Sequence, residues 1–223
     1  MRFAVKRLTP SDLGFFEAHF DKANVSGQKS LNLNRRVFID ELYPNLPDRL
    51  AALGGAIRVS LQVNGPGASY PALELSRKIT KRGSKNYRLN GEFLSNPKEA
   101  VGRFAALAPG DLALLAFEGS GEPTGVRFYA VSAANPDDAA LHSALNLPDG
   151  PSMVSLGAED LAARIAVAPP AHPVHDLFLE ADLVQDLEEA AQGDAQAARR
   201  LLARPGNRKV SIAQLAAARR RAE

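Results

Sequence analysis

The sequence contains no cysteine and no apolar run long enough to cross a membrane. Without cysteine there is no disulfide framework, no thiolate nucleophile and no zinc site with a cysteine ligand. The first residues, MRFAVKRLTPSDLG, lack the apolar stretch of a signal peptide. These absences predict a soluble protein with no membrane partner, and a reducing cytoplasm fits them best.

The sequence also lacks the residue patterns that commonly build a catalytic site. None of its 25 acidic residues lies two positions before a lysine, as one does in many metal-dependent nucleases. No G-x-x-x-x-G-K-[ST] phosphate loop occurs. His172 and His175 flank a proline in a proline-rich stretch, which favours a solvated loop over a metal site. We therefore expect a binding protein with no catalytic site, metal or cofactor of its own.

What the sequence does have is positive charge gathered in one half. Residues 1–104 hold 17 basic and 9 acidic side chains, residues 105–192 hold 2 and 14, and residues 193–223 hold 8 and 2. Mixed charge is the usual solution for solubility, so this segregation predicts a basic face and a polyanionic partner, most simply nucleic acid. The alternative is a protein-interaction adaptor that binds partner chains through its acidic middle and basic tail.

The apolar pattern predicts a mainly β first part. Six segments alternate or are rich in β-branched and aromatic residues, and two, 35–42 and 136–145, have helical spacing. Strands that follow one another without a helix each time favour an antiparallel barrel or sandwich over a parallel sheet. The predicted strands are 3–8, 29–34, 56–63, 72–79, 111–119 and 125–133.

The composition changes at the proline-rich stretch AVAPPAHP, residues 166–173. The following residues are rich in alanine and leucine and are interrupted by glycine and proline, which predicts three short helices. We therefore expect a β domain over 1–155, a linker over 156–174 and a helical C-terminal segment over 175–223.

Five stretches of the chain, taken in order, carry a resemblance to a known family. They are VKRLTPSDLG (5–14), QKSLNLNRRVFIDELYP (28–44), LELSRKITKRGSKNYRLNGEFLSNP (73–97), GDLALLAFE (110–118) and VRFYAVSAANPDDAALHSAL (126–145). Together they resemble the N-terminal effector-binding domain of the EcoRII restriction endonuclease. The resemblance implies a seven- or eight-stranded open antiparallel DNA-binding pseudobarrel with two short helices, a fold also found in plant B-three-type transcription factors.

The resemblance also implies a function, the sequence-specific recognition of double-stranded DNA by two arms that enter the major groove. Such a module reads the target or effector site in a restriction-modification or related defence system. The nuclease's acidic-lysine signature is missing from this chain. The chain is therefore either the DNA-reading part of a restriction endonuclease, with a nuclease domain or subunit as partner, or a recognition module that stands alone, such as a transcriptional regulator.

The resemblance places an N-arm around Lys22 to Asn32 and a C-arm from Arg77 to Asn90. Residues 76–88 of the second region hold six Lys or Arg and no acidic residue. Arginine and lysine suit guanine in the major groove, and asparagine and glutamine suit adenine. The candidate DNA-binding residues are Lys22, Asn24, Ser26, Gln28, Lys29, Asn32, Arg77, Lys78, Lys81, Arg82, Ser84, Lys85, Asn86, Arg88 and Asn90.

Within this set we expect arginine to read bases and lysine to contact phosphates. At least one of Arg77, Arg82 and Arg88 is expected to read a base. Gly83 suits a tight turn that would fold the C-arm into a hairpin. Tyr87 is expected to pack in the core.

Overall fold

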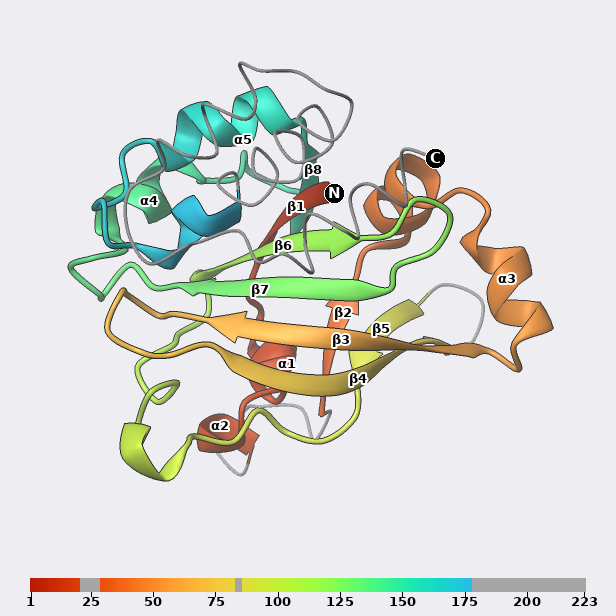
Figure 1. The fold of residues 1–223 in the computed structure, drawn as a ribbon, viewed down its shortest axis with the longest axis horizontal. Coiled ribbons are helices and arrows are strands. Elements are labelled where there is room, and N and C mark those ends of the chain that lie inside the picture. The colour runs from red at the N-terminus through yellow and green to blue at the C-terminus, as the bar shows by residue number, and fades with distance from the viewer. Residues whose placement is uncertain (21–28, 83–85, 178–223) are drawn as a thin grey trace, which may run out of the picture. The chain divides into compact units, whose positions relative to one another are not determined.

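The computed structural model describes residues 1–20, 29–82 and 86–177. This part of the chain contains eight strands and several short helices (Figure 1). Their bounds are β1 Arg2–Arg7, β2 Ser30–Leu33, β3 Ala56–Asn64, β4 Leu73–Arg82, β5 Asn86–Asn90, β6 Leu112–Glu118, β7 Gly125–Val131 and β8 Met153–Leu156. The helical segments are α1 Pro10–Leu13, α2 Glu17–Phe20, the π-helix η1 Arg36–Leu42, α3 Leu46–Ala52, η2 Lys98–Ala100, α4 Ala139–Ala144, α5 Ala158–Ile165 and η3 Pro173–His175.

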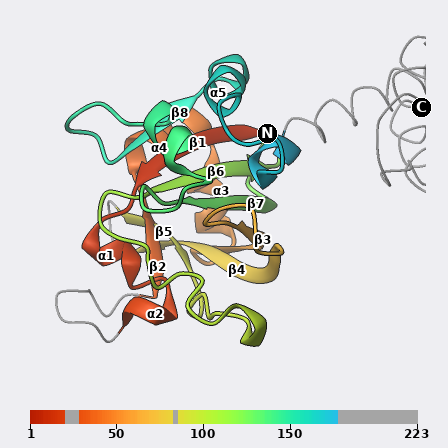
Figure 2. The ribbon, with the colours of Figure 1, turned by 90° about the vertical axis from the view of Figure 1, so that its left-hand side faces the viewer.

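The strands form one sheet in the order β2-β5-β4-β3-β7-β6-β1-β8. Neighbouring strands are antiparallel except for β3 and β7, which are parallel. The sheet curls into a nearly closed barrel, and its strands can be followed around the curve in Figure 2. The prediction of a mainly β, mainly antiparallel barrel is confirmed.

One half of the barrel wall, made by β2, β5, β4 and β3, has one buried and one exposed face. In β3 the side chains of Ile57, Val59 and Leu61 are buried in the core, whereas those of Arg58 and Ser60 are exposed. This alternation follows from the two-residue repeat of a strand that is covered on one side only. This half of the wall therefore presents a polar face.

The other half of the wall, made by β7, β6 and β1, is buried on both faces. In β6 the side chains of Leu115 and Phe117 belong to the barrel core, and those of Leu112 and Leu114 are buried on the outer face. Helices α4 and α5 contact β7 and β1 and lie over this outer face (Figure 1). An unbroken apolar run such as LALLAFE is typical of a strand buried on both sides.

The π-helix η1 fills the opening between β2 and β8, the two ends of the sheet. It begins three residues after β2 and contacts β8. Val37, Phe38 and Ile39 are buried in the barrel core, and the Ser155 hydroxyl of β8 donates a hydrogen bond to the Glu41 carboxylate. The helix predicted over 35–42 thus closes the barrel where strand pairing stops.

A buried ion pair connects β1 to β2, a strand in the half of the wall with the exposed polar face. Lys6 is 3% exposed and Asp12 is fully buried, and 2.9 Å separates Lys6 Nζ from Asp12 Oδ2. The Asp12 carboxylate also accepts hydrogen bonds from the backbone N–H and hydroxyl of Thr9 and from the backbone N–H of Asn32 in β2. Asp12 therefore joins β1, α1 and β2.

A buried arginine fixes the loop between β3 and β4. The Arg103 guanidinium donates hydrogen bonds to the carbonyl oxygens of Gly65 at 2.7 Å, Pro71 at 2.8 Å and Val63 at 3.3 Å. Burial without a carboxylate partner lowers the pKa of Arg103 to about 10. These bonds set the end of β3 and the start of β4, and so help to place the polar face.

The segment 156–174, predicted to be a linker, instead packs as part of the barrel unit, which extends from Met1 to Val174. Leu161 and Ile165 of α5 are buried. His172, expected in a solvated loop, is buried, and its Nε2 lies 2.9 Å from a carboxylate oxygen of Asp138. The proline-rich composition misled the prediction because these apolar and polar contacts come from distant parts of the chain.

The second unit is His175–Glu223. The three helices predicted for this segment cannot be compared with the structure, because residues 178–223 lie outside the described residues. Within the part of the chain that the structure describes, no helix has the length and apolar character needed to span a membrane.

Candidate nucleic-acid interface

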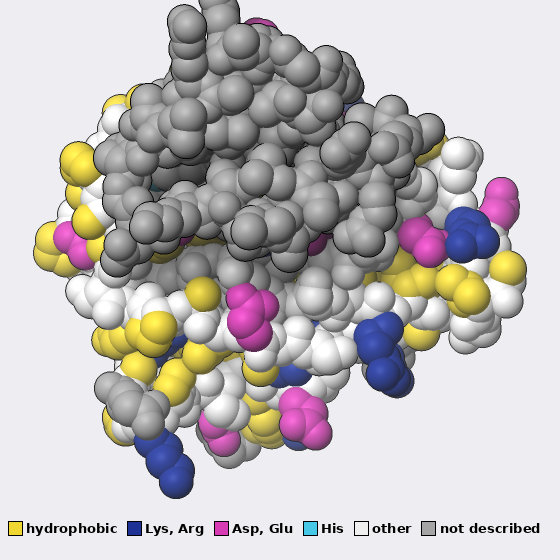
Figure 3. Space-filling view, viewed as in Figure 1, with side chains coloured by type: hydrophobic (Ala, Val, Ile, Leu, Met, Phe, Trp, Pro, Cys, Tyr) yellow, Lys and Arg dark blue, Asp and Glu magenta, His cyan; other side chains and the backbone are white. Residues whose placement is uncertain are grey.

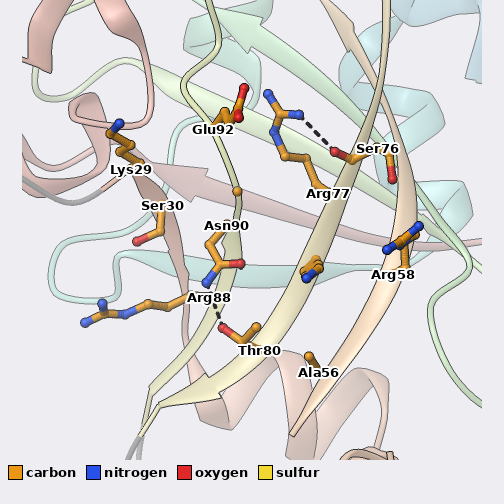
Figure 4. Close-up of a pocket in the computed structure, with 12 residues that line it drawn as sticks. Lys29, Ser30, Ala56, Arg58, Ser76, Arg77, Thr80, Arg88, Asn90 and Glu92 are labelled. Atoms are coloured by element: carbon orange, nitrogen blue, oxygen red, sulfur yellow. Dashed lines mark hydrogen bonds between the residues drawn. The ribbon is translucent and has the colours of Figure 1, made fainter. Parts of the chain in front are cut away.

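The half of the barrel wall made by β2, β5, β4 and β3 is called the open half-barrel below. A hollow with a volume of about 870 Å³ lies on its polar face (Figure 4). It collects side chains from all four strands of that half and from the residues beside β2 and β5. The described residues that line it are Lys29, Ser30, Ala56, Arg58, Ser76, Arg77, Lys78, Thr80, Arg88, Asn90, Gly91 and Glu92.

The strand register sets these side chains in rows across the sheet. Lys78 of β4 lies between Arg58 of β3 and Asn90 of β5, and Asn90 lies opposite Ser30 of β2. Residues directly opposite each other on neighbouring strands point to the same face, with Cβ atoms about 4.5–5.5 Å apart. One row therefore presents an arginine, a lysine, an asparagine and a serine in succession.

The neighbouring row contains Thr80 of β4, Arg88 of β5 and Asn32 of β2. Arg88 extends toward β2 in Figure 4, while Arg58 lies at the opposite side of the hollow. Every member of both rows is partly or largely exposed except Ser30, which is buried. The two rows place hydrogen-bond donors across about three strand spacings, or roughly 14 Å.

The charge of the hollow is strongly positive. Its described lining contains Lys29, Arg58, Arg77, Lys78 and Arg88, but only one acidic residue, Glu92. Among the described residues, no carboxylate forms an ion pair with Arg58, Lys78 or Arg88. Such a surface attracts anions, and its attraction weakens with added salt.

Arg77 differs from the other cations because its guanidinium is already bonded. It donates hydrogen bonds to the backbone carbonyl oxygens of Ser76 at 2.9 Å and Phe93 at 3.0 Å. Partial burial lowers its pKa, and the nearby Glu92 carboxylate opposes that effect. Gly91 has a φ of +146°, and a Cβ there would lie 2.8 Å from Arg77 Cδ, so a side chain at 91 would displace the arginine.

Phe93 links the two predicted DNA-binding regions. Its ring packs edge-on against Phe20 at 4.2 Å between centroids, and Lys29 Nζ lies 3.9 Å from its centre. Phe20 and Lys29 are the described residues on either side of 21–28, while the Phe93 carbonyl holds Arg77 at the start of the predicted C-arm. One residue therefore contacts the ends of both regions.

Of the predicted residues, Lys29, Arg77, Lys78, Arg88 and Asn90 line the hollow together. Asn32 lies beside them in the register, and the exposed Lys81 occupies the alternate position on β4, on the other face from Lys78. Arg82 and Asn86 are opposite each other at the ends of β4 and β5, and nothing is described of their side chains. Lys22, Asn24, Ser26, Gln28, Ser84 and Lys85 lie outside the described residues.

The region predicted as the C-arm is the antiparallel pair β4–β5, which supports the predicted hairpin. Both strands also pair on their other sides, β4 with β3 and β5 with β2, so they belong to the barrel wall. Ile79, Tyr87 and Leu89 are buried in the core, as expected for Tyr87. This differs from an arm that stands free of the barrel, because these apolar side chains hold the strands in the sheet.

Four further residues that the sequence did not indicate as DNA-binding also line the hollow: Arg58, Ser76, Thr80 and Glu92. The alternation in AIRVSLQV does indicate that Arg58 faces away from the core. Its position opposite Lys78 depends on strand pairing across 20 residues, which the pattern does not give.

The face shown in Figure 3 carries Lys and Arg in separate groups, interspersed with neutral and acidic side chains. Positive charge is thus local, and the hollow is where five cations share one surface. In the described part of the chain, no group of three or more His, Asp or Glu side chains is arranged to hold a metal ion. No model of a known protein family and no curated protein matches the chain.

Proposed function

We propose that this protein recognises double-stranded DNA in a sequence-specific manner, with the hollow on the open half-barrel as its central contact surface. The observation that carries the proposal is the lining of that hollow, in which five Lys or Arg residues meet a single carboxylate. Duplex DNA is a regular polyanion, and contacts to its phosphates provide much of the affinity of DNA-binding proteins.

The neutral polar groups of the hollow support reading of bases as well as attraction to phosphates. Asn32 and Asn90 lie in the same rows as Arg88 and Lys78. Arginine and asparagine are the side chains that recognise guanine and adenine in the major groove. Asn90 Nδ2 already donates to the Thr80 hydroxyl at 2.9 Å, so Asn32 is the freer amide of the two.

The resemblance to the EcoRII effector-binding domain supports the same proposal. That domain is a barrel, this chain is also a mainly β barrel, and residues of the predicted C-arm lie in the paired strands β4 and β5. In the proposal, the N-arm around Lys22 to Asn32 and the C-arm from Arg77 to Asn90 enter the major groove, and Lys29 and Arg88 of the two arms line the same hollow. The protein is then the target-reading module of a restriction or related defence system, acting with a nuclease domain or subunit.

Among the three arginines predicted to read bases, Arg88 is the strongest candidate. The Arg77 guanidinium is held by two carbonyl groups, whereas Arg88 has no ion-pair partner among the described residues. A bidentate contact from arginine to guanine contributes about 1–3 kcal/mol of discrimination. We therefore assign base reading to Arg88. Lys81, which is exposed near the end of β4 and lies outside the hollow, is kept as the predicted backbone contact.

The test begins with selection of preferred duplexes from a random-sequence pool by the full chain. Enrichment of a short motif is expected, and the logarithm of affinity should fall with the logarithm of salt concentration with a slope near −5 if about six phosphates are contacted. Arg88→Ala should then weaken binding to the enriched site by about 1–3 kcal/mol more than binding to random duplex. Lys81→Ala should weaken both alike.

Lys98→Ala provides the matched control, because Lys98 is exposed and does not line the hollow. It should leave both affinities unchanged. Failure to enrich any motif, together with equal losses for Arg88→Ala on both duplexes, would contradict sequence-specific reading. Salt-insensitive binding to a protein partner without retention on DNA would favour the adaptor function instead.

A further inference from the structure

We propose that Arg58 and Lys78 together form a binding site for one phosphate group of the DNA backbone. The proposal rests on the proposed function and adds Arg58 of β3, which lies outside both predicted arms, to Lys78 of the predicted C-arm. The two residues are directly opposite in the β3–β4 register, both are exposed, and both line the hollow.

Two like charges directly opposite each other on neighbouring strands destabilise a sheet. Here the residues in the adjoining positions are the neutral pairs Ser60–Ser76 and Ala56–Thr80. The pair is therefore a local concentration of positive charge that does not stabilise the sheet.

The acidic residues nearest in sequence and register are occupied elsewhere. Glu74 lies two rows away, opposite Gln62, and its carboxylate accepts a hydrogen bond from Gln62 Nε2 at 2.7 Å. Glu92 interacts with Arg77 at the other side of β4, where Figure 4 shows the two side chains close together. No described carboxylate thus forms an ion pair with Arg58 or Lys78.

The donors of this pair suit a phosphate group. The planar guanidinium of Arg58 offers two parallel N–H groups to two phosphate oxygens, and the Lys78 ammonium adds a compact charge. The Ser76 hydroxyl, one row along the same face, adds a third kind of donor. A shared phosphate would bring the two cations together and remove their mutual repulsion.

The sharing has a measurable consequence. The magnitude of the salt slope falls by about 0.9 for every phosphate that the protein no longer neutralises. Arg58→Ala and Lys78→Ala should each flatten the slope by about one, and the double variant should also flatten it by about one, because only one phosphate is involved. In each of the three variants, the affinity for the random duplex and the affinity for the preferred duplex should fall by the same factor.

Melting temperatures distinguish a phosphate site from a pair that stabilises the fold. Because removal of either charge relieves repulsion, the single variants should melt at the same temperature as the wild type or higher, although they bind DNA more weakly. Lower melting temperatures in both single variants would assign the pair to folding and overturn the proposal. A flattening of about two in the double variant would mean two separate phosphates and would also overturn it.

Binding would be measured by fluorescence anisotropy of a labelled random duplex with the full chain, at several salt concentrations from about 50 to 200 mM. Lys98→Ala is the control and should leave the slope unchanged. A second measurement, titration with inorganic phosphate followed by NMR of the Arg58 and Lys78 side-chain resonances, separates the proposals. Shifts of these resonances without any DNA binding would defeat the proposed function but keep the phosphate site.

DNA binding that is unaffected by all three variants would leave the proposed function intact and defeat the phosphate site. Polyglutamate serves as the probe for an acidic protein partner. If it binds in a manner that depends on Arg58 and Lys78 while duplex DNA does not bind, the site is specific for carboxylates and the phosphate assignment is wrong.

Discussion

Replacing Asp12 with asparagine should destabilise the protein more than any other single loss of a charged side chain on β1 or α1. The Asp12 carboxylate is fully buried and receives four donors: the Lys6 ammonium, the Thr9 backbone N–H and hydroxyl, and the Asn32 backbone N–H. Asparagine nearly preserves the shape but leaves the buried lysine without a counter-charge. Breaking a buried ion pair in this way costs about 3–5 kcal/mol.

Removing the other partner of the ion pair, with Lys6→Met, should lower the stability by less. Asp12 would keep two backbone N–H groups and a hydroxyl as partners, so its charge would stay partly compensated. We expect a loss of about 1–3 kcal/mol, the range for a buried polar group that loses one partner. The double variant, in which no buried charge remains, should be more stable than Asp12→Asn alone.

Urea unfolding of the full chain, followed by the near-ultraviolet circular dichroism of the buried tyrosines, would measure these differences. Asp160→Asn is the control, because it breaks the exposed Asp160–Arg164 pair of α5 and should cost no more than about 0.5 kcal/mol. The reasoning would be refuted if Asp12→Asn cost less than about 1 kcal/mol, or if the two single losses simply added in the double variant.

Phe93→Ala should lower stability by about 1–2 kcal/mol, since the change removes both the packing against the Phe20 ring and the cation–π interaction with Lys29. It should also weaken DNA binding in an anisotropy titration, whereas Val101→Ala, at a site 84% exposed, should change neither property. Arg103→Met should lower stability by about 3 kcal/mol or more, because the carbonyl groups of Val63, Gly65 and Pro71 lose a charged donor and the bonds to Val63 and Gly65 are buried. A thermal melt of Arg103→Met that matched the wild type would show that those carbonyl groups are satisfied without the guanidinium.

The sequence predicted those strands whose apolar pattern is strong. Segments such as AIRVSLQV and DLALLAFEG correspond to β3 and β6. It missed β5, a strand of five residues in which only Tyr87 and Leu89 are apolar, and β8, in which Met153 alone is fully buried. In both strands the partner strand supplies the stability, and partner choice is a tertiary property.

The candidate site was predicted only in part, because it also depends on contacts between residues that are distant in sequence. The density of Lys and Arg in residues 76–88 indicated where positive charge lies, but not which side chains are bonded already. Arg77 reaches the Phe93 carbonyl because Gly91 leaves room for it, and Arg58 joins the hollow through its register with Lys78. Neither contact involves residues close enough in sequence for a local pattern to reveal it.

The pairing of β1 also has a consequence for how the chain folds as it is synthesised. This strand leaves the ribosome well before its neighbours β6 and β8, with Arg2 opposite Phe117 and Lys6 opposite Met153. Contacts between residues so far apart in sequence form slowly, because a long loop must close before they stabilise anything. Until β6 and β8 have been synthesised, the apolar residues Phe3 and Val5 lack their native cover, so the nascent chain exposes an unpaired strand during that interval.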